Sequence, residues 1–532
     1  MSDPIWLLGA VRVTARYRAP TGDGSLLAAP PLAHIGTQLD ANADRLAKAN
    51  VHIAGASLGE FRQRARAEAI EAACRYLAEN GEHALHKSDR LIVAGHQPEF
   101  FHPGVWVKNF VLAGQAQRHG RAALNLVVDN DVVKSPALQV PVVADDPNAV
   151  DVEAIPFDKM VSDSPYEERR VADRRLLDSF PDRLREKTQA WGYEPVTQST
   201  WPLLRKELDG GANLGEAISR VRRHWERQWG VHNLELPVSR LAETEAFRGF
   251  VHELLTNLPR FVDCYNAALD AYRAANHLRS HHHPAPDLER KGDWIEAPFW
   301  VWRADAPRRV KLFARPAGAL LELQAGERSL GTIPSDPAGF MNTWLSLTER
   351  GWKVRPRALT LTLFSRLGFA DTFIHGIGGG KYDEVTDDII RRFFGIEAPG
   401  YSVVSATIRL PIRRFPGTSL DLHRAERAVR DLDWNPQIYP EPKCAVPELV
   451  FEKTRLIEDE PADKIDRRGW FRQLQRVTRD MRPVVENEHK AMQRNVGRLR
   501  AELAANEILG SREFSWLLFP EGHLRDAFVA QV

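Results

Sequence analysis

Cysteine is scarce in this sequence. Three cysteines, Cys74, Cys264 and Cys444, lie far apart in a chain of 532 residues. They form no CxxC pair, which argues against a zinc ribbon and against a disulfide framework. Isolated free cysteines are typical of a reducing compartment.

Long uncharged apolar runs and an excess of one charge are also missing. No window approaches the ~18 apolar residues that a membrane-spanning helix needs, and residues 1–9 lack the features of a signal peptide. We therefore expect a cytoplasmic protein with no membrane partner. Because 72 basic residues balance 71 acidic residues, nucleic acid is not an expected partner either.

The chain is too long for one hydrophobic core, since domains stop growing near ~250–300 residues. An apolar run at 90–94, a loop, a helical pattern at 105–117 and an apolar run at 124–128 predict a strand–helix–strand unit of a buried parallel sheet. Further strands are predicted at 359–363 and 372–374. The predicted fold is α/β, with a buried parallel-sheet core, helical stretches between its parts and a C-terminal coiled-coil-like helical section.

Composition and periodicity divide the chain into six segments. We predict an N-terminal extension (1–56), a first half of the core (57–160), a helical connecting insertion (161–290), a small β-rich segment (291–345), a second half of the core (346–415), and a helical, coiled-coil-like section that returns to the core (416–532). Capping boxes at 57–60 and 213–216 mark two helix starts. Apolar residues from Leu474 to Leu503 mostly recur every three or four positions, which predicts a helical seam kinked at Pro483.

The loop at 94–105 holds the densest set of polar groups in the chain. It joins a strand to a helix, where free backbone amides and the positive helix end suit a phosphate. We predict that His96, Gln97 and His102 are catalytic and that Gly95, Gly104 and Asn109 bind substrate or nucleotide. His102 and Gly104 also echo the His-x-Gly-His loop of nucleotidylyltransferases. The alternative is that both histidines are ordinary loop residues.

Two further segments follow predicted strands. Asp129 and Asp131 could hold Mg²⁺, accept a proton or bind an ammonium group, or they could simply cap a turn. The glycine-rich segment 376–382 precedes a helix and lets a ligand approach the backbone, although its spacing matches neither a Walker loop nor GxGxxG. There the predicted binding residues are Gly376, Gly378, Gly379, Lys381 and Tyr382, and the alternative is a tight turn. The tract His281–His283 predicts an exposed loop rather than a metal site.

These blocks resemble, in order and spacing, the bacillithiol-biosynthesis cysteine-adding enzymes, a family of cysteine ligases. The family's Thr-Gly-Gln-Gln and Leu-Phe-Thr-Gly-Pro segments are similar to 94–97 and 100–104, with matches at Gly95, Gln97 and Phe101. Both acids of its Asp-His-Asp segment match Asp129 and Asp131. Its Arg-Pro-Leu segment, its Gly-Gly-Pro-Gly-Glu-Ile-Ala-Tyr turn and its final Leu-Phe-Pro-Asn-Gly segment are similar to 357–359, 375–382 and 518–522. In the turn, Gly376, Gly378 and Tyr382 match, while the family's Glu falls on Gly379.

The resemblance implies a Rossmann-like parallel-sheet core with helical insertions. It also implies a ligase that condenses a carboxylate, such as cysteine, with the amine of an amino-sugar conjugate. It adds Arg357 to the predicted binding residues. ATP or ADP with Mg²⁺ is the implied cofactor, and a homodimer through the coiled coil is the implied assembly. Two alternatives stay open: a non-catalytic protein that binds a nucleotide or sugar nucleotide, and a nucleotidylyltransferase.

Overall fold

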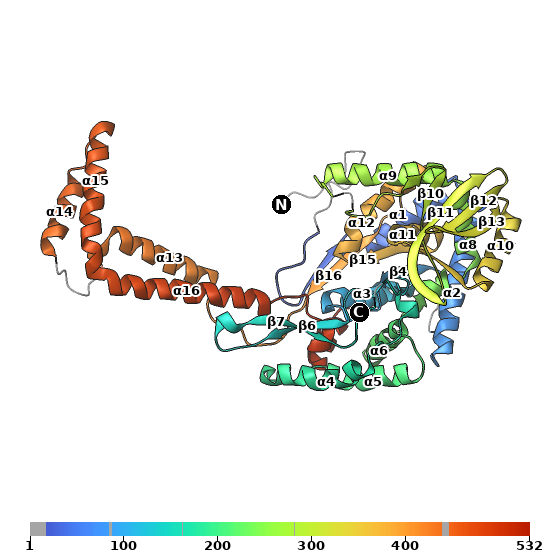
Figure 1. Ribbon diagram of the computed structural model, residues 1–532, viewed down its shortest axis with the longest axis horizontal. Coiled ribbons are helices and arrows are strands. Elements are labelled where there is room, and N and C mark those ends of the chain that lie inside the picture. The colour runs from blue at the N-terminus through green and yellow to red at the C-terminus, as the bar shows by residue number, and fades with distance from the viewer. Residues whose placement is uncertain (1–16, 85–87, 162, 281, 439–445, 532) are drawn as a thin grey trace.

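The computed structural model describes residues 17–84, 88–161, 163–280, 282–438 and 446–531. The predictions for residues 1–9, His281 and Cys444 lie outside these ranges. The fold is mixed α/β, and a body built on two sheets carries a long helical arm (Figure 1). In the described ranges, no helix has both the length and the apolar character needed to span a bilayer.

The main sheet has six strands in the order β1-β16-β15-β4-β5-β8. Their bounds are β1 Ser25–Ala29, β4 Leu91–His96, β5 Ala122–Val127, β8 Leu234–Pro237, β15 Ala370–His375 and β16 Ser402–Thr407. All neighbours are parallel except β1, which pairs antiparallel with β16. The predicted strands at 90–94, 124–128 and 372–374 are thus confirmed. The expected N-terminal extension contributes an edge strand to this sheet.

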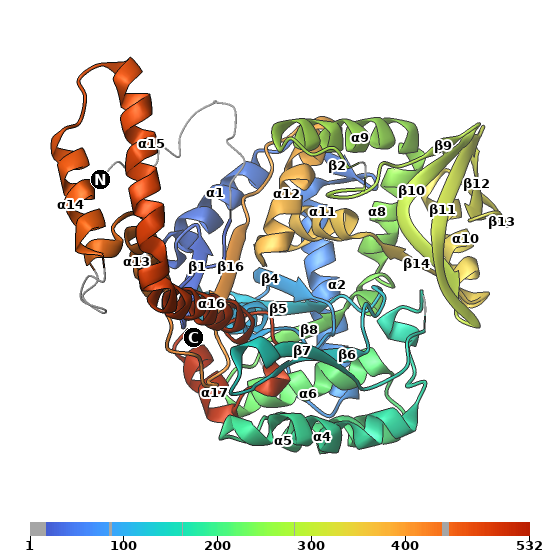
Figure 2. The same ribbon diagram turned by 60° about the vertical axis from the view of Figure 1, so that its left-hand side comes forward.

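Helices cover both faces of the main sheet (Figure 2). On one face, α1 (Ile35–Ala47) and α3 (Pro103–Arg118) pack on Ile92 and Ala94. On the other face, α2 (Leu58–Glu79), α11 (Ala358–Gly368) and α12 (Ile377–Ile389) pack on Leu91 and Val93. Since both faces are buried, the first four residues of β4, Leu91–Ala94, form a continuous apolar run instead of an alternating one.

The chain changes direction across the sheet between β4 and β15. From β4 the chain passes through α3 to β5, whereas from β15 it passes through α12 to β16 on the other side. The helices α3 and α12 therefore leave the same sheet edge toward opposite faces. In open α/β sheets such a switch point is where ligands bind.

The strand predicted at 359–363 is wrong, because these residues lie in α11. Leucine at 359, 363 and 367 repeats every four positions, and all three side chains are buried against the core. Leucine and threonine also alternate in residues 359–363, so this short run fits the period of a strand as well as that of a helix. Packing against α2 and β15 selects the helix.

The antiparallel layer expected in 291–345 is present as a second sheet with the order β13-β12-β11-β10-β14. Its strands are β9 Arg290–Lys291, β10 Trp294–Arg303, β11 Ala306–Ala317, β12 Leu320–Ala325, β13 Arg328–Pro334 and β14 Trp352–Pro356, with α10 (Pro337–Glu349) packed on β13. Two small hairpins are β2 (His52–Ile53) with β3 (Ala56–Ser57) and β6 (Ala137–Val142) with β7 (Asp151–Pro156).

The segment between the hairpins and the second sheet is largely helical, but it also holds β8, a strand of the main sheet that the sequence did not predict. Its helices are α4 Arg174–Thr188, α5 Thr197–Asp209, α6 Leu214–Gln228, α7 Val238–Leu241, α8 Glu245–Thr256 and α9 Leu258–Ala275. The predicted capping boxes at Ser57 and Asn213 both form. A break in the helix before Pro259 separates α8 from α9.

Four helices form the arm, which we define as residues 419–509: α13 Ser419–Trp434, α14 Pro447–Glu458, α15 Lys464–Met481 and α16 Glu486–Leu509. The predicted kink is confirmed, because the stretch 482–485 that contains Pro483 is a single 3-10 turn. Along the predicted seam, Val477, Met481, Val485, Val496 and Leu499 are buried. After the arm, α17 (Glu521–Val529) returns to the body and stacks Phe528 on Phe110.

Candidate functional site

The carboxyl edge of the main sheet gathers the three segments that were singled out from the sequence. β15, β4 and β5 are parallel neighbours, so the residues that follow them emerge at one edge. These residues are His375–Gly376, His96–Gln97 and Asp129–Asp131. This edge is also the switch point of the sheet.

His96 ends β4 and is held by its own loop. Its Nδ1 lies 3.1 Å from the Gln97 carbonyl oxygen, and its ring packs edge-on against Phe101. Burial and the nearby Lys108 ammonium keep the pKa of His96 well below its ordinary value. Lys108 on α3 donates to the Gly95 carbonyl oxygen at 2.9 Å, and burial lowers its pKa to about 8. The sequence did not identify Lys108 as a candidate residue, because its burial arises only when the chain folds.

The two aspartates after β5 are used by protein donors. Asp129 accepts from the amide of Ser239 at 2.9 Å and from its hydroxyl at 2.5 Å. Asp131 accepts from Gln97 at 2.9 Å and from Arg309 of the second sheet at 3.0 Å. These carboxylates therefore join the segments that follow β4 and β5 to α7 and to the second sheet.

The contacts of these aspartates do not fit a divalent cation. Each of the four carboxylate oxygens already accepts a hydrogen bond, counting the Val132 amide on Asp131. A guanidinium beside Asp131 also occupies the place of a cation. Among the described residues, no group of three or more His, Cys, Asp or Glu side chains could hold a metal.

Burial raises the pKa of Asp129 to about 7. The neighbouring Glu167 carboxylate acts in the same direction, and the two bonds from Ser239 oppose it. A carboxyl group with this pKa exchanges a proton near neutral pH.

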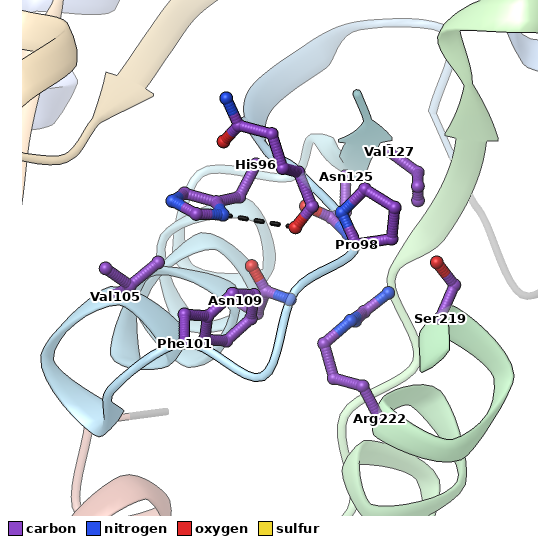
Figure 3. A pocket seen from close by; sticks show the side chains of 10 residues that line it. His96, Pro98, Phe101, Val105, Asn109, Asn125, Val127, Ser219 and Arg222 are labelled. Carbon is purple, nitrogen blue, oxygen red and sulfur yellow. Dashed lines mark hydrogen bonds between the residues drawn. The ribbon is translucent and has the colours of Figure 1, made fainter. Parts of the chain in front are cut away.

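A small cavity lies between the β4–α3 loop and α6 (Figure 3). Its volume is about 10 Å³, which is room for a single water. Asn109 borders it but donates at 2.7 Å to the buried carboxylate of Glu226, and Arg222 pairs with the same carboxylate. The predicted binding residue Asn109 is thus part of a buried hydrogen-bond network. A larger hollow of about 300 Å³ lies against α2 and α8, away from the sheet edge.

The N-terminus of α3 is closed by the chain's own return segment. A Cβ at Gly104 would stand 2.1 Å from the Ala406 carbonyl oxygen, so only glycine fits against β16. His102, the N-cap residue, lies 3.3 Å from Glu513, and burial with the charge of Arg512 lowers its pKa to about 3. This packing does not favour phosphate contacts from His102.

No described residue closes the N-terminus of α12 in this way. Gly376 is its N-cap, and no described side chain caps it, so the first-turn amides have no partner within the helix. A Cβ at Gly376 or Gly378 would meet no atom of the described residues within 4 Å, and neither residue needs a positive φ. Packing therefore does not explain why glycine occupies these two positions. In contrast, Gly380 packs closely on Val403 and Gly379 on His375.

His375 and Asp383 form a buried pair beside this open turn. The Nε2 of His375 lies 2.9 Å from Oδ2 of Asp383, which also binds Arg366 at 2.7 Å. Burial opposes ionisation, but the Arg366 guanidinium and the hydrogen bond from His375 outweigh it and hold the pKa of Asp383 below its ordinary value. The His375 side chain is only 5% exposed. Its Nδ1 has no hydrogen-bond partner in the described part of the chain and faces Gly379.

Sequence reasoning missed this pair. A histidine at a strand end before a glycine run was a usable signal, but Arg366 lies on another helix. The remaining predicted residues are peripheral to it: Lys381 is exposed and Tyr382 packs edge-on against His283. Arg357 pairs with Glu296 and stacks on Trp300.

Comparisons with known proteins do not assign this site. No family model matches the chain, and no curated protein matches it significantly.

Proposed function

We propose that the chain is a ligase-like enzyme with a Rossmann-like core that joins a carboxylate to an amine with a nucleoside triphosphate as co-substrate. The observation that carries the proposal is the open, glycine-lined start of α12 beside the buried His375–Asp383 pair. The family resemblance favours cysteine as the carboxylate and an amino-sugar conjugate as the amine. A cytoplasmic location fits such substrates.

The first step activates the carboxylate. A carboxylate oxygen attacks the terminal phosphorus, so a nucleoside diphosphate leaves and an acyl phosphate forms. The amides of Ile377, Gly378 and Gly379 would bind the phosphoryl oxygens, because unpartnered amides at a helix start attract anions.

The second step forms the amide. The amine nitrogen attacks the acyl carbon, the C–N bond forms, and the bond from carbon to the phosphate oxygen breaks. Ionised Asp383 favours the tautomer in which Nε2 of His375 carries the hydrogen. The Nδ1 lone pair can then accept the proton from the amine, and inorganic phosphate leaves.

An isotope experiment tests this sequence directly. The protein is incubated with ATP, ¹⁸O-carboxylate-labelled cysteine and a panel of primary amines, and products are read by mass spectrometry. We expect an amide product and one ¹⁸O atom in each phosphate released. If no amine gives a product, or if the phosphate carries no label, the proposed chemistry is wrong. Mass spectrometry of ligands retained by the purified protein would reduce the number of candidate substrates.

We also infer that the arm pairs two copies of the chain. The predicted seam is buried within one chain, but most of the exposed large apolar side chains of the described residues lie on the arm. They are Leu420, Trp434, Ile438, Phe451, Ile457, Ile465 and Phe471. A second copy presents the same apolar surface by symmetry, as closed homodimers require.

A further inference from the structure

Four arginines surround one buried aspartate at the amino edge of the main sheet, opposite the proposed active site. We call Arg62, Arg66, Arg90, Arg121 and Asp371 the amino-edge cluster. Asp371 lies 2.8 Å from Arg66, 3.5 Å from Arg90, and 3.7 Å from both Arg62 and Arg121. The nearby Asp89 also acts on Arg66. Four guanidinium groups against two carboxylates leave an excess of positive charge.

Two of these arginines are satisfied by the end of α11. Arg62 donates to the carbonyl oxygens of Arg366, Leu367 and Ala370 at 2.8–3.0 Å. Arg66 donates to the carbonyl oxygen of Phe369 at 3.2 Å. Carbonyls at a helix C-terminus carry negative partial charge, so this pair has a structural explanation.

Arg90 and Arg121 have no such explanation. Within the described ranges, neither guanidinium makes a hydrogen bond, and the Nε of Arg121 is buried without a partner. Each precedes a strand at paired positions, since Leu91 is opposite Ala122. Like charges at such neighbouring positions repel each other. Both side chains reach the surface, with 43% and 24% of their areas exposed.

We propose that the amino-edge cluster binds a phosphate-type oxyanion between Arg90 and Arg121, with Arg66 behind them. Guanidinium groups hold such oxygens through paired N–H donors. The anion would offset the repulsion between the two strand starts. This site is independent of the proposed ligase chemistry because it lies at the other edge of the sheet.

Thermal unfolding in inorganic phosphate tests the proposal, with potassium chloride matched for ionic strength because salt alone screens the cluster. We expect phosphate to raise the melting temperature of the full-length protein above the chloride control. The double variant Arg90→Gln, Arg121→Gln should lose this rise while folding normally in chloride. Arg75→Gln, an exposed arginine of α2 paired with Glu71, should keep it. Isothermal titration should show at least a tenfold weaker phosphate affinity for each single variant.

A parallel titration with glycerol phosphate separates two sources of the anion. Tighter binding than inorganic phosphate points to a phosphate monoester, and equal or weaker binding points to free phosphate; either result supports the site. Equal stabilisation of the wild type by phosphate and chloride would overturn the proposal. So would an undiminished phosphate effect in the double variant.

Discussion

His375 Nε2 and Asp383 Oδ2 lie 2.9 Å apart in the core, although eight positions separate the two residues along the chain. The end of β15 presents the imidazole, and the second turn of α12 brings the carboxylate back to it. The pair leaves the Nδ1 atom of the ring directed at the first turn of the same helix.

Replacing His375 with Gln separates catalysis from folding. Gln can still donate to Asp383 but cannot take a proton, so we expect turnover to fall by roughly 10²–10⁴ with a nearly unchanged melting temperature. Asp383→Asn should instead destabilise the fold by about 3–5 kcal/mol, because buried Arg366 loses a charged partner. Turnover assays and chemical unfolding of both variants check this contrast. Full turnover by His375→Gln would remove the histidine from the reaction.

The glycines of α12 should respond oppositely to alanine. Gly378 has open space around it, so Gly378→Ala should stabilise the helix by about 0.5–1 kcal/mol while weakening anion binding and turnover. At Gly380 a Cβ would stand 2.3 Å from the Val403 side chain, so Gly380→Ala should destabilise the protein by about 1–3 kcal/mol. Unfolding midpoints and ATP titrations distinguish the two. Unchanged ATP binding in Gly378→Ala would contradict the anion site.

Asp129 makes the stability of the fold depend on pH. Its folded pKa of about 7 is above the ordinary 3.8, so its protonated form favours the folded state below pH 4. That contribution is lost as pH rises from about 4 to about 7, at about 1.4 kcal/mol for each pKa unit. Asp129→Asn is neutral throughout and should gain stability relative to the wild type between pH 4 and pH 7. Urea unfolding across this range measures the difference, and Asp182→Asn, at an exposed position, should show none.

A buried charge network ties α6 to β8. Glu235 pairs with Arg222 and Arg223, and these charges outweigh burial to lower its pKa. Glu235→Gln leaves two buried arginines short of a counter-charge and should cost about 3–5 kcal/mol. The exposed Glu71–Arg75 pair is the matched control, since Glu71→Gln should cost at most about 1 kcal/mol. If both variants lost the same free energy of unfolding in guanidinium, the buried network would stabilise the fold no more than an exposed ion pair does.

The exposed apolar residues of the arm are expected to form the contact between two chains. Phe451 and Ile465 have 74% and 78% of their areas exposed. The double variant Phe451→Glu, Ile465→Glu should convert a dimer to a monomer in sedimentation velocity, because charge does not bury in an apolar contact. The same substitution at the body residue Leu345, which is also exposed, should leave the dimer intact. A wild-type monomer at micromolar concentration would contradict the inference.

Local patterns in the sequence predicted the elements that depend on neighbouring residues. The β4–α3–β5 unit, both capping boxes and the kink at Pro483 follow from runs of a few residues. The run 359–363 failed because it fits two periods, and only the packing of α11 decides between them.

The candidate site was predictable only in part for a related reason. Strand ends located His96, Asp129 and Gly376 correctly at one edge. The sequence did not show that Arg309 neutralises Asp131, that Glu513 covers His102, or that Arg366 fixes Asp383. Each partner lies on a different element, so its effect appears only after folding.

The place of β15 beside β4 has a consequence for synthesis of the protein. Leu91 pairs with Ala370, and at ~5–20 residues per second the ribosome needs roughly 14–56 s to make the intervening chain. During that interval β4 can pair with β5 once β5 has been made, while its other side presents bare backbone N–H and C=O groups. Unpaired strand edges recruit other chains, so the nascent protein should depend on a chaperone until β15 emerges.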